Sequence, residues 1–139
     1  MTGQNISQQR SLDQKRAAAA WEAIKEIRDR GSESLEKKYK PLAGSGAMDV
    51  QTSGLGQTLA FWRAKASKRE EHKAIYRHTS DWIKQQIPEI GQVDLLEWLI
   101  KTATTDQYRR ATVEGQAFLT WLKRFAEAEL KGELHGKED

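Results

Sequence analysis

Apolar and polar residues follow a helical pattern along almost the whole chain, without internal repeats or strand-like alternation. The pattern is strongest over residues 7–30, 67–87 and 104–130, where apolar side chains recur at the spacing of one helical turn. The pattern therefore predicts an all-α protein, a single-domain bundle of about six helices with a long C-terminal helix.

The N-terminal helix is expected over residues 7–30. Its apolar face is formed by residues spaced along one side of the helix: Ala17, Ala20, Trp21, Ile24 and Ile27. Gly31 follows as the residue that ends this helix. Segments 1–6 and 132–139 lack an apolar face, so we expect them to be flexible ends of a single domain that spans 1–139.

The next segment combines a weak helical signal with residues that disrupt helices. We expect a short helix over 34–40. Pro41 lacks a backbone N–H, and Gly44 and Gly46 have low helix propensity. The segment 41–53 is therefore predicted to be a flexible loop.

Two capping boxes mark helix starts in the second half of the chain. Ser67 is followed three residues later by Glu70, which predicts a helix that begins at this point. Thr104 and Gln107 have the same spacing and predict the start of the longest helix. Its apolar pattern continues to about Leu130.

Shorter helices are expected over 55–65 and 93–102. The sequence SGLGQT before the first of these could suggest a phosphate-binding turn, but no strand precedes it and no Lys-Ser or Lys-Thr pair follows. We therefore interpret Gly54 and Gly56 as a turn that permits a tight approach to a helix start. Gly115, inside the longest helix, indicates a close helix crossing.

Composition favours a packed domain inside the cell. Five Trp in 139 residues argue for a real core, and the absence of Cys excludes disulfides and thiolate metal sites. No apolar run reaches the roughly 18 residues that a bilayer requires, and the N-terminus has no apolar signal region. We expect a soluble, cytoplasmic protein that has no membrane partner.

Few residues could form an active site. His72 and His78 lie on different faces of one expected helix and His135 lies near the C-terminus, so no pair of histidines is placed to chelate an ion. We interpret His78 and Asp81 as a surface hydrogen bond rather than a catalytic pair. Because acidic clusters and nucleophile motifs are also absent, we expect no catalytic or metal-binding residue, no cofactor and no small-molecule substrate.

The tryptophans separate an expected core from an expected interface. Those within or beside apolar stripes, which favours core packing, are Trp21, Trp82 and Trp121. Less regular apolar positions are held by Trp62, Trp98 and Leu99. We predict that these three residues contact partner subunits from the surface.

Positive charge is concentrated in the middle of the chain. Arg69, Lys73, Arg77 and Lys84 form one stripe beside the buried face of their expected helix. Such a stripe matches a phosphate backbone, although an ordinary solvated face would look the same. The candidate nucleic-acid contacts are Arg63, Lys65, Lys68, Arg69, Lys73, Arg77, Lys84, Arg109, Arg110, Lys123 and Arg124.

Several segments, taken in order, resemble one protein family. GLGQTLAFWRAK (54–65) and YRRATVEGQAFLTWLKRFAEAEL (108–130) are similar to hallmark stretches of the small helical subunit of type III-B CRISPR effectors. That subunit is the fifth-named protein of the Cmr, or RAMP-module, complex. QKRAAAAWEAIKEI resembles the family's opening helix and EKKYKPLAG its second. The likeness covers about residues 10–130.

The resemblance implies a non-catalytic structural subunit of an RNA-guided antiviral ribonucleoprotein. In that family, copies stack as a minor filament beside backbone subunits that carry the guide RNA. The expected partners are therefore other Cmr-type effector subunits, further copies of itself, guide RNA and target RNA. The alternative is a purely protein-binding helical spacer without direct nucleic-acid contact. A DNA-binding regulator is disfavoured because no helix-turn-helix pair is apparent.

Overall fold

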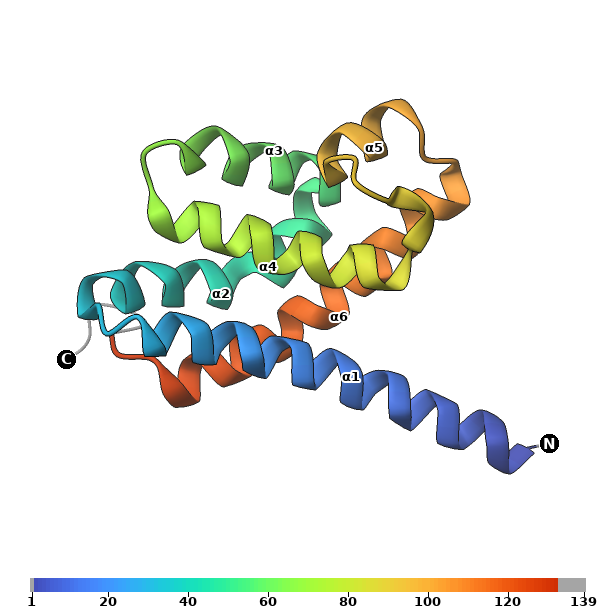
Figure 1. Ribbon diagram of the computed structural model, residues 1–139, viewed down its shortest axis with the longest axis horizontal. Coiled ribbons are helices and arrows are strands. Elements are labelled where there is room, and N and C mark those ends of the chain that lie inside the picture. The colour runs from blue at the N-terminus through green and yellow to red at the C-terminus, as the bar shows by residue number, and fades with distance from the viewer. Residues whose placement is uncertain (1, 133–139) are drawn as a thin grey trace.

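The computed structural model describes residues 2–132, which are helical apart from short connections (Figure 1). The helices are α1 (Thr2–Asp29), α2 (Glu33–Ser53), α3 (Leu55–Ala66), α4 (Glu70–Gln86), the 3-10 turn η1 (Pro88–Ile90), α5 (Leu95–Lys101) and α6 (Thr105–Glu129). This confirms the predicted all-α fold with a long C-terminal helix. Helix α1 begins at Thr2, within the segment 1–6 that was predicted as a flexible end. Of the predicted flexible end 132–139, all but Gly132 lies outside the described residues.

The long helices form the body of the bundle. Helix α6 packs against both α1 and α2, and α4 connects this group to α3, against which α5 packs (Figure 1). The largest side chains at the centre are fully buried: Tyr39, Trp62, Trp82 and Phe118. Each such side chain contributes on the order of 1.5–3 kcal/mol through burial, so packing between helices dominates the fold.

Helix α2 continues through the segment that the sequence predicted as a loop, so that prediction was wrong. The reason lies in the packing of α2 against the rest of the bundle. Gly46 and Val50 are buried, and a Cβ atom on Gly46 would lie 3.1 Å from Cδ2 of Leu119 in α6. The glycine thus permits a close approach of the two helices. Pro41 is tolerated on the exposed side, where its missing N–H costs one helical hydrogen bond.

The other glycine interpretations are confirmed. Gly54 adopts a φ of 88° between α2 and α3. The N–H of Gly56 donates to the hydroxyl of Tyr108 at 2.8 Å, and a Cβ atom there would lie 2.6 Å from that oxygen. A Cβ atom on Gly115 would lie 3.3 Å from Cδ1 of Ile83, which shows the expected close crossing of α6 and α4.

One capping box is confirmed and the other was wrong. Thr104 and Gln107 form the complete reciprocal pair of hydrogen bonds at the start of α6. Ser67 instead ends α3 with helical backbone angles, whereas capping requires an extended residue. The extended residue is Arg69, with φ −130° and ψ 111°, so α4 begins at Glu70 without a side-chain cap.

Candidate nucleic-acid and subunit interfaces

A polar network that is buried at His78 and Tyr39 and exposed at Arg30 and Arg77 joins α1, α2 and α4 around the Glu26 carboxylate. Its Oε2 accepts from Nη2 of Arg77 at 2.6 Å and from Nη2 of Arg30 at 2.8 Å. Its Oε1 lies 2.6 Å from Nε2 of His78, whose Nδ1 lies 2.8 Å from the hydroxyl of Tyr39. A neutral imidazole that donates to Glu26 and accepts from Tyr39 satisfies every group.

The protonation of this network follows from its surroundings. Burial lowers the pKa of His78 and outweighs the opposing effect of Glu26, which keeps the ring neutral. Burial alone would raise the pKa of Glu26, but the hydrogen bonds from His78, Arg77 and Arg30 lower it to about 2. The carboxylate is therefore an anion held by three donors.

One prediction about this region was wrong. His78 is 7% exposed and bonds to residues of other helices, rather than forming a surface pair with Asp81. Arg77, a predicted RNA contact, also donates to Glu26 and so has an anionic partner within the chain. Pattern analysis could not find these pairs, because Glu26 lies 51 residues from Arg77 along the chain.

A second buried network lies between α1, α4 and α6. Glu114 is 6% exposed and accepts from Nε and Nη2 of Arg16 at 3.0 and 2.8 Å. The indole N–H of Trp82 donates to the same carboxylate at 3.1 Å. A buried carboxylate with a bidentate guanidinium and a third donor has its hydrogen-bonding capacity largely satisfied.

Several candidate cations are engaged by acceptors of the chain itself. These contacts are Arg63 with Asp94 at 2.5 Å, Arg77 with Glu26 at 2.6 Å, Arg109 with Asp106 at 2.8 Å, Arg124 with Glu127 at 3.8 Å, and Arg110 with the carbonyl of Gln86. The Asp94 carboxylate also accepts from Tyr76 at 2.8 Å. The predicted set of RNA contacts is thus divided by the tertiary structure.

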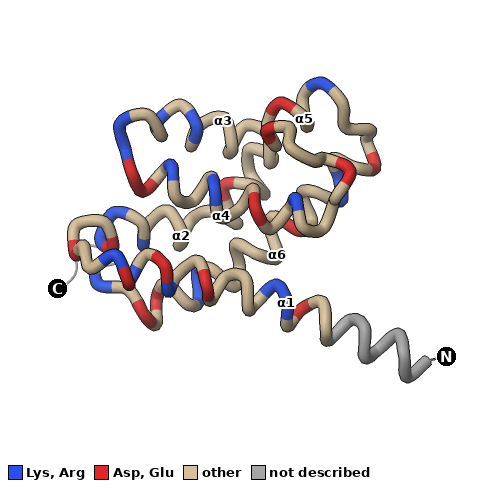
Figure 2. The backbone as a smooth tube through the Cα atoms, in the orientation of Figure 1, with Lys and Arg blue, Asp and Glu red and all other residues tan. Residues whose placement is uncertain are grey.

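A second group of candidates forms no ion pair among the residues that the structure describes: Lys65, Lys68, Arg69, Lys73, Lys84 and Lys123. The first four follow one another around the α3–α4 turn (Figure 2). Lys38 of α2 lines the same surface pocket as Lys68 and Arg69. We call Lys38, Lys65, Lys68, Arg69 and Lys73 the basic end.

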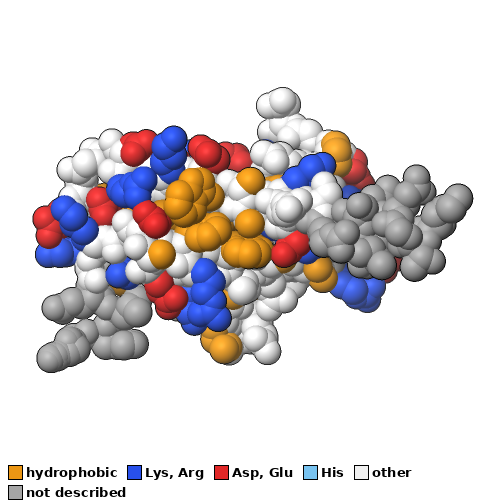
Figure 3. All heavy atoms as spheres, turned by 90° about the horizontal axis from the view of Figure 1, so that it is seen from below, with side chains coloured by type: hydrophobic (Ala, Val, Ile, Leu, Met, Phe, Trp, Pro, Cys, Tyr) orange, Lys and Arg blue, Asp and Glu red, His pale blue; other side chains and the backbone are white. Residues whose placement is uncertain are grey.

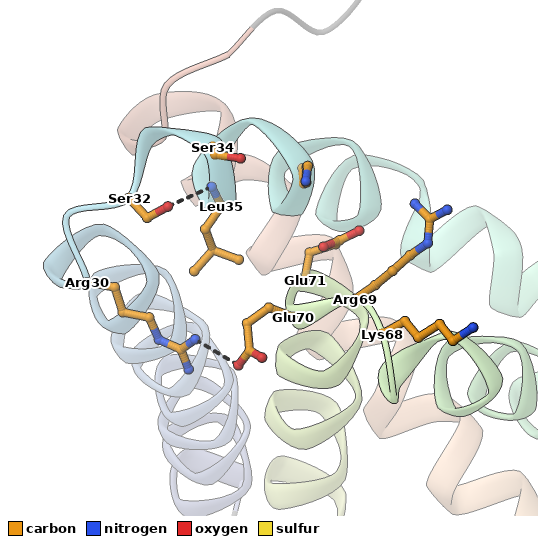
Figure 4. A pocket seen from close by; sticks show the side chains of 9 residues that line it. Arg30, Ser32, Ser34, Leu35, Lys68, Arg69, Glu70 and Glu71 are labelled. Atoms are coloured by element: carbon orange, nitrogen blue, oxygen red, sulfur yellow. Dashed lines mark hydrogen bonds and ion pairs between the residues drawn. The ribbon is translucent and has the colours of Figure 1, made fainter.

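The pocket at the basic end lies between the starts of α2 and α4 (Figure 4). The hydroxyl of Ser32 caps α2, and Arg30 contacts Glu70 at 3.3 Å. Lys68 and Arg69 project from the α3–α4 turn without an interaction with the other side chains drawn (Figure 4). Exposed cations of this kind contact phosphate groups without reading sequence.

The predicted subunit contacts are inside the protein. Trp62, Trp98 and Leu99 are 1%, 3% and 4% exposed, so the prediction that they contact partners from the surface was wrong. They pack in the core of the bundle, where the short helices α3 and α5 meet. Trp21, predicted to be buried, is 40% exposed.

An aromatic cluster lies on the outer side of α1 and α6. The ring of Trp21 packs edge-on against Phe125 at a centroid distance of 5.2 Å, and Trp121 stacks on Phe125 at 5.5 Å. Figure 3 shows apolar side chains gathered on this side, with charges of both signs around them. We call Trp21, Trp121 and Phe125 the aromatic cluster. Trp21 directly follows Ala20 and lies at the edge of the apolar face of α1. This edge position is the one feature of the sequence that indicates its exposure.

The described part of the chain lacks both a metal-binding cluster and a membrane-spanning helix. Residues 2–132 contain no group of three or more His, Asp or Glu side chains that could hold a metal ion. No helix within the same range is both long and apolar enough to span a bilayer.

The chain matches a known protein-family model. The model of the family described as CRISPR-associated protein (Cas_Cmr5) matches residues 12–129. The chain belongs to this family. It is therefore a CRISPR-associated Cmr subunit, and the resemblance predicted from the sequence is confirmed. The match runs from within α1 to the last residue of α6, so it covers nearly the whole helical bundle.

Proposed function

We propose that this Cmr subunit is a non-catalytic structural component of an RNA-guided antiviral complex, in which it stacks in a minor filament and helps to hold guide and target RNA. The basic end is the surface that would contact the RNA. The proposal rests on one observation, namely that the cations of the basic end have no anionic partner within the described chain while many other candidate cations do.

Charge and geometry support this assignment. Lys65, Lys68, Arg69 and Lys73 are exposed and belong to two consecutive helices and the turn that joins them. Cations that gain a phosphate partner release counterions from the RNA, which is the main driving force for binding that ignores sequence. Cations that already have a carboxylate partner gain less, because one anion replaces another.

The test is charge reversal at the basic end, with a matched control. The variant K68E/R69E/K73E changes three unpaired cations. The control K101E/R109E/R124E changes three exposed cations that have carboxylate partners on their own helices, so both variants have the same net charge. Binding of labelled single-stranded RNA is measured by fluorescence anisotropy as a function of salt, and target-RNA capture is measured in the assembled complex.

The basic-end variant is expected to bind RNA about 100-fold more weakly at 0.1 M salt, because three phosphate contacts with a salt slope of roughly 0.7 each are lost. The control is expected to lose much less. Equal losses would show that net charge alone matters, and no loss in either variant would contradict RNA binding by this surface.

The alternative function is a protein-binding spacer without RNA contact, and the aromatic cluster favours it. Exposed tryptophans are frequent at the centres of protein interfaces, and Trp21 stands beside Phe125 on a surface with mixed charge. The spacer function predicts that W21A and F125A block incorporation into the complex, while the K68E/R69E/K73E variant assembles and captures RNA normally. Photocrosslinking of RNA to this subunit in the complex separates the two functions, since the spacer gives no crosslink.

A further inference from the structure

The three donors around Glu26 form a complete anion-binding arrangement. Two guanidinium groups, those of Arg30 and Arg77, converge on one oxygen atom at 2.8 and 2.6 Å. The imidazole N–H of His78 donates to the other oxygen at 2.6 Å. We call Arg30, Arg77 and His78 the Glu26 cradle. Convergent guanidinium groups with a further N–H donor are the groups that proteins use to bind phosphate oxygens.

The cradle is reachable from the surface and continuous with the basic end. The Glu26 side chain is 37% exposed and lines two grooves, one between α1 and α4 and one along α1. Arg77 follows Lys73 by one turn of α4. Arg30 lines the pocket of the basic end together with Lys68 and Arg69. RNA that contacts the basic end would therefore pass beside the cradle.

Glu26 now occupies the position that a phosphate oxygen would take. The groove between α1 and α4 is lined by the carboxylates Glu22, Glu26 and Asp81 against the cations Lys15 and Arg77, so it repels an external anion while Glu26 is charged. The low pKa of Glu26, about 2, means that it stays charged at neutral pH.

We propose that the Glu26 cradle is a latent phosphodiester-binding site, and that Glu26 is an internal competitor that limits how tightly the subunit binds RNA. This inference rests on the proposed function, because it extends the RNA path from the basic end along α4. The proposal predicts that the protein binds RNA more weakly than it would if the Glu26 carboxylate did not occupy Arg30, Arg77 and His78.

The test removes the competing charge and retains the fold. In E26Q, the amide oxygen can still accept from His78, while the amide N–H group toward the guanidinium groups cannot accept from them. Arg77 is then released, whereas Arg30 keeps its contact with Glu70 at 3.3 Å. The control E97Q changes net charge equally at an exposed pair of α5, where Glu97 lies 3.7 Å from Lys101. Binding of fluorescein-labelled single-stranded oligouridylate by the full-length protein is measured across a salt series, with circular dichroism as the check on folding.

E26Q is expected to bind about fivefold more tightly at 0.1 M salt, with a log–log salt slope steeper by about 0.7, as one additional phosphate contact requires. E97Q should match the natural sequence. R77Q should change affinity less than about twofold in the natural background and abolish the gain in the E26Q background, since Arg77 is available only when Glu26 is neutral. E26D, which retains the charge but withdraws it by one methylene, should give a smaller gain of the same sign.

Each negative result has a distinct meaning. If the K68E/R69E/K73E variant loses RNA binding but E26Q and E26D bind like the natural sequence, the latent site is wrong and the proposed function stands. If E97Q gains as much as E26Q, or the gain survives R77Q, net charge explains the effect and the cradle does not bind phosphate. If neither the natural sequence nor E26Q binds RNA, both proposals fail.

Discussion

Two cations that are neighbours on α4 show how the bundle assigns different roles to the same type of residue. Lys73 and Arg77 are one turn apart and both are exposed. Arg77 faces α1 and donates to Glu26, whereas Lys73 has no carboxylate partner in the described chain. The helix that packs beside a stripe of positive charge therefore decides the role of each cation in it. Cations next to that helix form ion pairs that stabilise the fold, and cations beyond it remain available to a partner.

The ion pairs between helices, and above all the buried one at Glu114, should contribute most to stability. Replacing Glu114 with Ala removes the acceptor shared by the Trp82 N–H and the Arg16 guanidinium, which is 19% exposed and keeps only Asp13 at 3.7 Å. We expect a loss of about 2–3 kcal/mol in the free energy of unfolding, measured by urea denaturation, because a buried N–H donor and a partly buried charge lose their hydrogen bonds. E97A, at an exposed pair, should change stability by less than about 0.5 kcal/mol. A loss of that small size for E114A would show that this buried pair contributes no more to stability than the exposed pair of Glu97 and Lys101.

The second-largest effect is expected on acidification, which should destabilise the network around Glu26 and His78. The pKa of His78 is lowered by burial from its ordinary 6.5, and that of Glu26 is lowered from 4.5 to about 2 by its donors. Below these ordinary values the unfolded chain binds more protons than the folded one, so stability falls as the pH decreases. Arg30, Arg77 and Tyr39 face this site. The pKa values of Arg30 and Tyr39 are raised, so both groups stay protonated throughout that range.

The measurement is thermal unfolding between about pH 7.5 and pH 4, where the midpoint temperature should decrease steadily. In E26Q the part of the decrease that comes from the carboxylate should disappear, while the part from His78 remains. A midpoint temperature that is constant or rises on acidification would mean that the folded protein does not favour an anionic Glu26 and a neutral His78.

The smallest expected effect is the difference in stability between variants of Arg77 and Lys73. R77Q removes a partly exposed ion pair and should cost about 0.5–1 kcal/mol, whereas K73Q, one turn away, should be neutral within about 0.3 kcal/mol. The free energies of unfolding of both variants are measured by urea denaturation at low salt. The difference between the two losses should decrease in about 1 M salt, because salt screens the ion pair of Arg77 and Glu26. Equal losses in the free energy of unfolding would show that Arg77 and Lys73 contribute equally to the fold, which would contradict the distinction between them.

The candidate sites were predictable only in part. The stripe on α4 and four cations of the basic end follow from residue type and helical spacing in the sequence. The fifth cation, Lys38, was not predicted, because only the fold brings α2 beside the α3–α4 turn. The division of that stripe was not predicted either, because Arg30, Arg77 and Glu26 meet only when α1 packs against α4. The aromatic cluster was missed for the same reason, since Trp21 and Phe125 are brought together by the contact between α1 and α6.

The sequence by itself determined those features that depend on neighbours within a few residues. Thr104 and Gln107 cap α6 with their own backbone, and the apolar stripes of α4 and α6 define the buried faces. Family membership also follows from the sequence, because it is contained in the order of residues 12–129.

The tertiary structure alone decided the course of α2, the burial of Trp62 and the pairing of Arg77. Local propensity at Pro41 and Gly46 favours a break by about 1 to 3 kcal/mol per residue. The contact of α2 with α6 buries Val50 and requires the small residue at position 46, which outweighs that preference. Contacts between distant segments are not encoded at any single position, so only the folded chain shows which charges remain free for a partner.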